Sequence, residues 1–279
     1  MYQTLISVPT LVENLSNPDW LILDCRFSLA DTELGRFMYE GSHIQGAYYL
    51  HLDHDLSSPI TPLTGRHPMP DAEQLSAKLR ACGLNNDTQV VVYDDNIGAM
   101  AARAWWLLRW LGHDQVAVLD GGFDAWQKAQ APVTSELPAP RQGHFTAHSR
   151  ADYSVEANAL MQPNHAWQLV DARAAERFRG EKEPIDPIAG HIPNAWNRPL
   201  TDNVAGIYFK APEVLRAEWE ALLKDTPVEQ VVHMCGSGVT ACHNQLAMEH
   251  AGLTGSKLYP GSWSEWIRDP ERPIALGTS

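Results

Sequence analysis

Residues 230–252, QVVHMCGSGVTACHNQLAMEHAG, contain the pattern that decides the fold of this chain. The short apolar run at 230–234 is typical of a buried strand, and the segment after Thr240 is typical of a helix that ends at Gly252, where a left-handed C-cap suits glycine. A loop of the sequence Cys-Gly-Ser-Gly-Val-Thr joins the two. The stretch therefore predicts a strand, a loop that begins with cysteine, and a helix.

The predicted loop has the geometry of an anion site. Several backbone N–H groups would point inward, and the following helix would add the positive end of its dipole. Such surroundings favour a thiolate at Cys235 and would hold an anion. A single cysteine at a strand end is more often a small buried hydrophobic residue. An inert core position does not need a ring of free amides, however, so we interpret Cys235 as a nucleophile.

Composition limits the classes of function. The chain has 279 residues, 44% hydrophobic and 20% charged, with no apolar run long enough to span a bilayer. A net charge of −13 argues against nucleic acid or an anionic membrane as a partner, and it means that local groups must attract any anionic substrate. Four scattered cysteines and an N-terminus without signal-peptide features predict a cytoplasmic protein with reduced thiols.

Five sequence blocks occur twice in the same order, at a nearly constant offset of about 140 to 148 residues. Conserved order across several blocks indicates an internal duplication. The first four blocks are Asp-x-Arg strands, Gly-(Ser)-His-Ile segments, β-branched strands and helices ending in glycine; the fifth is a Gly-x-x-x-x-Trp tail. The clearest pairs are 20–26 with 167–173, 41–47 with 190–195, 89–94 with 230–235, and 121–126 with 261–266.

Each half alternates β-branched runs with helical patterns, which predicts an α/β fold with a mainly parallel sheet flanked by helices. We expect a first domain at 1–134, a linker rich in Pro, Ser and Thr at 135–150, and a second domain at 151–279. Where the second half has Cys235 the first has Asp94, which has no thiol to act as a nucleophile. The first domain is therefore predicted to be non-catalytic.

These tandem motifs, with Cys-Gly-Ser-Gly-Val-Thr only in the second copy, resemble the two-domain rhodanese family of sulfurtransferases over nearly the whole chain. The resemblance implies tandem rhodanese-like domains and a Cys235 persulfide that carries sulfane sulfur. The loop is similar to that of members that use 3-mercaptopyruvate, because members that prefer thiosulfate usually have cations where Gly236 and Ser237 stand. By the same resemblance, the loop from Gly236 through Gly238, Val239 and Thr240 would bind the sulfur.

Mercaptopyruvate-using members also have a Ser-His-Asp set that moves the thiol proton of the substrate. Motif matching assigns Ser237, His67 in a proline-rich loop at 56–70, and Asp53 to these roles. In such a relay the aspartate orients the histidine and the histidine polarises the serine. Simpler interpretations remain open, since each of the three could be an ordinary loop residue.

Arginine suits the oxyanion end of the donor. Arg177 matches the substrate-binding arginine of the family, but the position of a second arginine is taken by Asp186. Arg179 or Lys182 could replace it, and this departure weakens the mercaptopyruvate assignment. The Asp-x-Arg pair at 171–173 recurs in the silent half, so we expect it to be structural.

The leading hypothesis is an enzyme that moves sulfur from a small anionic donor, 3-mercaptopyruvate or thiosulfate, to cyanide, a thiol or a thioredoxin-like protein, with neither metal nor cofactor. A first alternative is a thiosulfate-preferring rhodanese. A second is a non-catalytic sulfur carrier or interaction module, which burial of Cys235 would favour. The loop argues against a cysteine-dependent phosphatase, because the loops of those enzymes end in an arginine, whereas Ala241 follows this loop.

Overall fold

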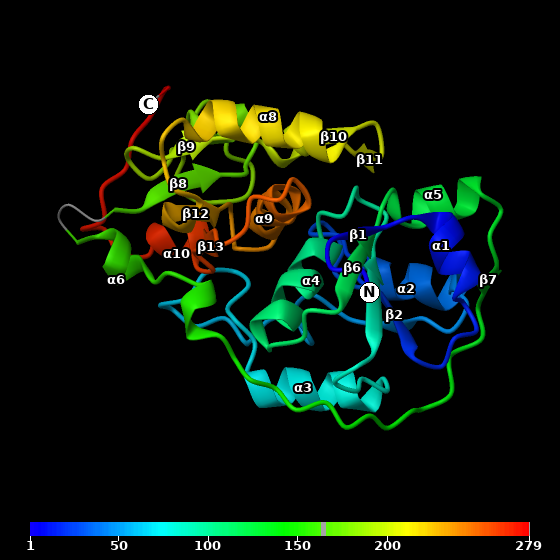
Figure 1. Cartoon of the computed structure of the whole chain (residues 1–279). Coiled ribbons are helices and arrows are strands. Elements are labelled where there is room, and N and C mark those ends of the chain that lie inside the picture. Colours follow the sequence, from blue (N-terminus) through cyan, green and yellow to red (C-terminus); the bar gives the residue numbers. More distant parts are fainter. Residues whose placement is uncertain (163–165, 279) are drawn as a thin grey trace. The chain divides into compact units, whose positions relative to one another are not determined.

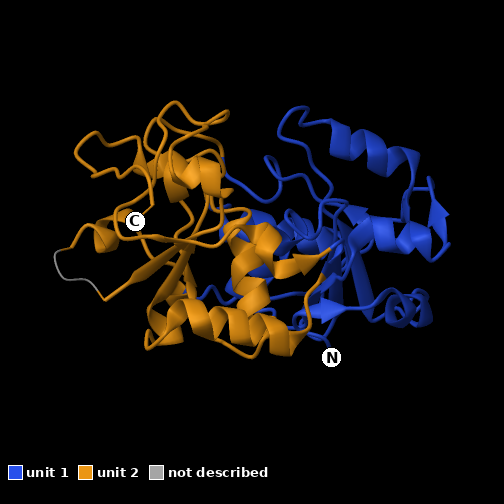
Figure 2. Ribbon diagram, turned by 90° about the horizontal axis from the view of Figure 1, so that it is seen from above, with its two compact units in different colours: residues 1–58, 69–150, 206–208 blue, residues 59–68, 151–205, 209–279 orange. Residues whose placement is uncertain are grey.

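The computed structural model describes residues 1–162 and 166–278. The chain folds into two compact units (Figure 2): unit 1 takes 1–58, 69–150 and 206–208, and unit 2 takes 59–68, 151–205 and 209–279. Most of the proline-rich loop of the first half thus belongs to unit 2.

The stretch at 135–150, expected as a linker, clusters with unit 1. The N–H groups of Gly143 and Phe145 donate to the carbonyls of Arg80 and Leu84, over 2.7 and 3.1 Å. These bonds fasten the stretch to the end of a helix of the first half.

Unit 1 is built on a five-stranded sheet in the order β1-β6-β5-β2-β4, and all neighbouring strands are parallel. Its strands are β1 (Leu5–Ile6), β2 (Trp20–Asp24), β4 (Tyr48–Tyr49), β5 (Gln89–Tyr93) and β6 (Val116–Leu119). Its helices are α1 (Val8–Glu13), α2 (Leu34–Gly41), α3 (Ala72–Ala81), α4 (Ala101–Trp110) and α5 (Gly122–Lys128). A small antiparallel pair, β3 (His43–Ile44) and β7 (Val133–Thr134), lies outside this sheet.

Unit 2 repeats the plan with a four-stranded parallel sheet in the order β13-β12-β8-β9. Its strands are β8 (Gln168–Asp171), β9 (Trp196–Asn197), β12 (Val231–Met234) and β13 (Lys257–Leu258). Its α-helices are α6 (Ala157–Leu160), α7 (Ala175–Phe178), α8 (Pro212–Leu223), α9 (Ala241–His250) and α10 (Ser262–Trp266). The chain also forms the strand pair β10 (Val204–Ala205) and β11 (Tyr208–Phe209), and the 3₁₀ turns η1 (Ala151–Tyr153), η2 (Leu200–Asn203) and η3 (Val228–Gln230).

Successive side chains of β12 point to opposite faces of the sheet, so the core of unit 2 lies on both faces. Val232 and Met234 pack in a cluster with Trp263 and Trp266 of α10. His233 points the other way and its ring lies edge-on to Trp219 of α8. Figure 1 shows α8 and α10 on opposite sides of β8 and β12, so side chains of successive strand residues are buried on both faces, as a parallel sheet requires.

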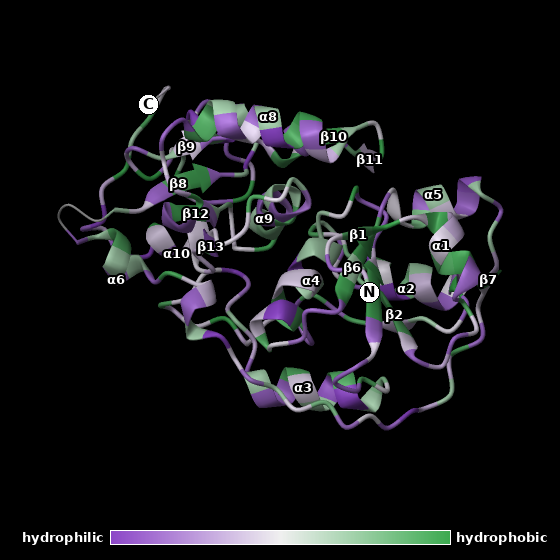
Figure 3. Cartoon of the chain, viewed as in Figure 1, coloured by the Kyte–Doolittle hydropathy of each residue, from purple (hydrophilic) through white to green (hydrophobic). Residues whose placement is uncertain are grey.

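The predicted α/β class and the predicted central elements are confirmed. The strands expected in the repeated blocks at 20–26 and 89–94 are β2 and β5, and Figure 3 shows the central strands as mostly hydrophobic. Their apolar side chains are fully or almost fully buried, apart from the half-buried Trp20 at the start of β2. Within the described residues, no helix combines the length and the apolar character needed to cross a membrane.

Candidate functional site

The cysteine-led loop lies at the carboxyl edge of the unit 2 sheet, where β12 ends and α9 begins. The N–H of Cys235 donates to Oγ of Ser262 over 3.1 Å, and the carbonyl of Cys235 accepts from the N–H of Trp263 over 3.0 Å. The start of α10 therefore fixes the backbone of Cys235 on both sides. Cys235 is 1% exposed.

Gly238 sets the curvature of this loop. Its φ angle is +74°, in the left-handed region, and a Cβ atom there would lie 2.1 Å from the carbonyl oxygen of Pro260. Both the backbone conformation and the close approach demand glycine. The predicted helix C-cap is also confirmed, because Gly252 has a φ of +78°.

The structure brings two of the predicted relay residues together. Nδ1 of His67 lies 2.7 Å from Oγ of Ser237, and both residues are buried. A buried hydroxyl within hydrogen-bond reach of an imidazole is the arrangement required for proton transfer. The third predicted member, Asp53, belongs to unit 1, where its N–H donates to Nδ1 of His51 over 3.1 Å.

The two predicted substrate-binding arginines lie in different surroundings. Nη2 of Arg177 lies 3.6 Å from the position that a Cβ atom on Gly236 would take, so this guanidinium borders the loop. Arg179 is bound at both Nε and Nη2 by the exposed carboxylate of Glu181, each at 2.7 Å. It lines a separate hollow with Trp196 and other residues of unit 2.

Sequence reasoning missed Arg66. Its Nη2 atom lies 2.8 Å from the position of a Cβ atom on Gly236, and its Nη1 atom donates to Oδ1 of Asp186. Asp186 also accepts at Oδ2 from Nη2 of Arg177, over 3.1 Å. The only signal in the sequence was Asp186 itself, an acid at a position where a cation was expected, because a buried carboxylate needs a cationic partner.

Two carboxylates balance these cations in different ways. Burial alone would raise the pKa of Glu183, but hydrogen bonds from Arg177, over 2.8 to 3.1 Å, and from two backbone N–H groups lower it. For Asp186, burial raises the pKa, and the attraction of Arg66 and Arg177 offsets this only in part. Glu183 is therefore the firmly ionised partner of Arg177.

The repeated Asp-x-Arg pairs are structural, as expected. Arg173 binds Asp171 through Nε and Nη2, the shortest contact being 2.7 Å, and also donates to the carbonyl of Gly190. Arg26 makes the same contacts to Asp24 in unit 1. Burial would lower the pKa of Arg173, but Asp171, together with Glu183 and Cys235, raises it. Arg173 therefore stays protonated, paired with Asp171 and near Cys235.

The counterpart loop in unit 1 already holds an anion. The carboxylate of Asp94 accepts four backbone N–H groups over 2.7 to 2.9 Å, two at each oxygen: those of Asn96, Gly98, Met100 and Ala101. Burial raises the pKa of Asp94, although these four bonds act to lower it. The duplicated loop is therefore an amide cradle for a negative charge, and in unit 1 a fixed side chain fills it.

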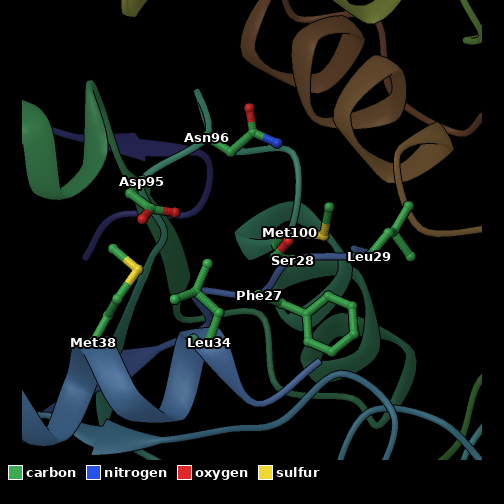
Figure 4. Close-up of a pocket in the computed structure, with 9 residues that line it drawn as sticks. Phe27, Ser28, Leu29, Leu34, Met38, Asp95, Asn96 and Met100 are labelled. Carbon is green, nitrogen blue, oxygen red and sulfur yellow. The ribbon is translucent and has the colours of Figure 1, made fainter. Parts of the chain in front are cut away.

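Beside this loop, unit 1 has a hollow of about 350 Å³. Figure 4 shows it surrounded by apolar side chains, with Leu34 and Met38 rising from α2 and with Asp95 and Asn96 at its rim.

In the part of the chain that the structure describes, one group of side chains has the atom types and the close spacing of metal ligands: Glu33, His51 and His54 of unit 1. Nε2 of His51 is 3.0 Å from the carbonyl of Thr32, and Nδ1 accepts a backbone N–H. The two imidazole rings are stacked, 4.2 Å apart and 26° from parallel. Since both nitrogens of His51 are engaged, the cluster fits a metal ion poorly.

The comparisons with known proteins agree with this geometry. The model of the rhodanese-like domain matches residues 7–129 and 155–269. The chain is 50% identical to a probable 3-mercaptopyruvate sulfurtransferase of Pseudomonas aeruginosa, over 98% of both chains, and 38% identical to the putative thiosulfate sulfurtransferase SseB of Mycobacterium tuberculosis, over 92% of this chain and 91% of that one. It resembles the structure of 3-mercaptopyruvate sulfurtransferase from Leishmania major with a TM-score of 0.86 and 30% identity, over 96% of this chain and 76% of the other.

Proposed function

The chain belongs to the rhodanese-like family, whose named relatives are sulfurtransferases, and from this premise we propose that it moves sulfane sulfur from 3-mercaptopyruvate to a thiophilic acceptor through a persulfide on Cys235. The acceptor would be cyanide, a small thiol or a thioredoxin-like dithiol. The four cysteines are free thiols, which is consistent with a cytoplasmic protein.

In the first half-reaction the Cys235 thiolate attacks the sulfur of the donor. The new S–S bond forms as the C–S bond breaks, and its electron pair leaves with the carbon as the enolate of pyruvate. The thiol proton of the donor passes through Ser237 and His67 to that carbon, which completes pyruvate. In the second half-reaction the acceptor attacks the outer sulfur, and Cys235 leaves as thiolate.

The observation that carries this proposal is the hydrogen bond between Ser237 and His67, 2.7 Å long, two residues along the loop from Cys235. Mercaptopyruvate brings a thiol proton that must be moved, whereas thiosulfate does not, so a proton relay at this place favours the thiol donor. Arg177 would bind the carboxylate of the donor through Nη1, because Glu183 occupies its Nε and Nη2 atoms, and the loop amides from Gly236 to Thr240 would stabilise the persulfide. Support for Asp53 as the residue that orients His67 comes from the sequence pattern alone.

A second candidate function is the non-catalytic sulfur carrier or interaction module. The observation in its favour is the burial of Cys235, at 1% exposure. Against it stand the cations around Gly236, which an idle site would not require.

Steady-state kinetics with 3-mercaptopyruvate and with thiosulfate, each with cyanide as acceptor, test the proposal on the wild type and Cys235→Ser. We expect mercaptopyruvate to have the higher kcat/KM and the variant to be inactive with both donors. Cys242→Ser is the control, because this buried thiol contacts the carbonyl of Gly238 from within α9 and should not carry sulfur. A higher kcat/KM with thiosulfate would mean that thiosulfate, and not 3-mercaptopyruvate, is the donor. Turnover by Cys235→Ser would contradict the mechanism.

Mass spectrometry of the protein after treatment with the donor alone distinguishes enzyme from carrier. A gain of one sulfur on Cys235, lost again on adding cyanide at the rate of turnover, is expected. A persulfide that forms but does not turn over would favour the carrier.

A further inference from the structure

The guanidinium of Arg66 lies beside the residue that follows the nucleophile. A Cβ atom on Gly236 would lie 2.8 Å from Nη2 of Arg66 and 3.6 Å from Nη2 of Arg177. Two cations of unit 2, one from the proline-rich loop and one from α7, therefore meet next to Cys235. Because the whole chain has a net charge of −13, an anionic donor has to be bound by local cationic groups of this kind.

The two edges of the Arg66 guanidinium have different partners. On one edge, Nη1 donates to Asp186. On the other edge, Nε is buried and has no hydrogen-bond partner among the described residues, and Nη2 faces Gly236. A buried N–H without a partner is unfavourable, so this edge is set up for an acceptor.

The Nε and Nη2 atoms of arginine form a fork that matches a carboxylate. Elsewhere in this chain the same fork is filled by an acidic side chain: Arg26 by Asp24, Arg173 by Asp171, and Arg177 by Glu183. In Arg66 the corresponding edge is turned toward the loop of the nucleophile. The missing acceptor is thus a carboxylate that the protein does not supply.

The backbone holds Arg66 in this place. Its N–H donates to Oγ of Ser264 over 3.0 Å, and the N–H of Ser264 donates to the carbonyl of Gly236 over 2.8 Å. A Cβ atom on Gly65 would lie 2.6 Å from the carbonyl oxygen of Gly261, so only glycine allows this close approach. The loop that presents Arg66 is therefore tied to the loop that carries the nucleophile.

Asp186 orients both cations. One of its oxygens accepts from Arg66 and the other from Arg177. Its side chain is 2% exposed. An arginine in this place would add a third positive charge against the other two, which explains why this chain has an acid there.

We propose that Arg66 binds the carboxylate of the α-keto acid donor through its Nε–Nη2 edge, opposite Arg177, and that Asp186 is the positioning residue that holds this edge toward the loop. The inference rests on the sulfur-transfer function proposed above and adds a donor-binding residue to it. On the side of Asp186, Arg66 also borders a hollow of about 270 Å³, which Arg268 lines as well.

The test compares 3-mercaptopyruvate with its methyl ester, which carries the same thiol but no charged carboxylate. In Arg66→Gln we expect kcat/KM for the acid to fall about 10- to 100-fold, through KM, because a hydrogen-bonded charge pair contributes about 1.5–3 kcal/mol. The kcat/KM of Arg66→Gln for the ester should be about the same as that of the wild type. Arg66→Lys keeps the charge but loses the fork. Its kcat/KM for the acid should therefore lie between those of the wild type and Arg66→Gln.

The matched control is Arg268→Gln, since Arg268 lines the same hollow but donates to the carbonyl of Thr64. It should leave the preference for the acid unchanged. Because His67 adjoins Arg66, the pH profile of kcat is recorded for each variant, and an unchanged profile is expected.

An unchanged ratio of acid to ester in Arg66→Gln would overturn the inference while turnover that depends on Cys235 still stands. An equal fall in kcat for both donors would also overturn it, since Arg66 would then act through His67. If the wild type turns over neither donor, the proposed function itself fails.

Discussion

At the scale of the residue, the site combines a nucleophile whose backbone is fixed with polar groups that come from other segments. Cys235 and Ser237 belong to one loop, whereas His67 and Arg66 come from a segment about 170 positions earlier in the sequence. Motif matching could predict His67 and Ser237 because both belong to a recognisable pattern. It could not predict Arg66, because its partner Asp186 lies 120 positions away and no local pattern links the two.

The relay at Ser237 leads to a prediction about donor dependence. Ser237→Ala removes the hydroxyl that contacts His67. We expect kcat with 3-mercaptopyruvate to fall about 100-fold, the lower end of the usual range for general acid–base catalysis, because its thiol proton loses its path. With thiosulfate, which has no such proton, the fall should stay below about 5-fold. Kinetics with both donors check this, with Ser154→Ala of unit 2 as a control; equal losses would argue for a purely structural role.

At the scale of the element, the sequence predicted the strand, loop and helix around Cys235 because each has a strong local signal. The observed strand is β12 (Val231–Met234) and the observed helix is α9 (Ala241–His250), within a residue or two of the expected bounds. The two-residue strands β1 and β4 were not predicted. Such short strands have no periodicity of their own and exist because a neighbouring strand offers a hydrogen-bonding edge.

Gly238 connects the loop to the segment before α10, and its replacement tests how rigid that connection is. Gly238→Ala would place a methyl group 2.1 Å from the carbonyl oxygen of Pro260 at a φ of +74°. We expect a loss of at least about 2 kcal/mol in the free energy of unfolding, from backbone strain and the clash together. Gly41→Ala is the matched control, because a Cβ atom there meets nothing within 4 Å. Urea denaturation measures both; equal stability of the two variants would contradict this account of the loop.

His233 makes β12 sensitive to acid. Burial lowers its pKa to about 3. In the unfolded chain the pKa is about 6.5, so below that pH the unfolded state binds a proton that the folded state does not. Stability should therefore fall as the pH falls, by about 2 kcal/mol at pH 5 compared with pH 7 from this residue alone.

His233→Gln removes this titration and can still reach Oγ of Ser256, which lies 3.2 Å from Nε2 of the histidine. The free energy of unfolding, measured by urea denaturation at both pH values, should change less with pH in the variant than in the wild type. The same pH dependence in both proteins would mean that His233 is not the group that titrates.

At the scale of the whole molecule, the duplication was readable because the repeated blocks keep their order, and the two sheets repeat the same strand order around β5 and β12. The two copies differ in the group that occupies the duplicated loop. In unit 1 the Asp94 carboxylate accepts four amides and closes the cradle; in unit 2 the corresponding position is a thiol. The same backbone device thus serves stability in one copy and, in our proposal, chemistry in the other.

This division predicts that Asp94→Asn affects stability and leaves sulfur transfer unchanged. The amide NH₂ group would face the N–H groups of Met100 and Ala101, which now donate to Oδ2 over 2.7 and 2.8 Å. Two buried donors would lose their acceptor, and unit 1 should lose about 2–4 kcal/mol of stability. Asp95→Asn is the control, since Asp95 lines the neighbouring hollow. Calorimetry of thermal unfolding measures the stability. Steady-state kinetics with the donor, at a temperature well below the unfolding transition, measures sulfur transfer. If kcat for the donor fell in step with stability, Asp94 would belong to the catalytic apparatus, and the assignment of chemistry to unit 2 alone would be wrong.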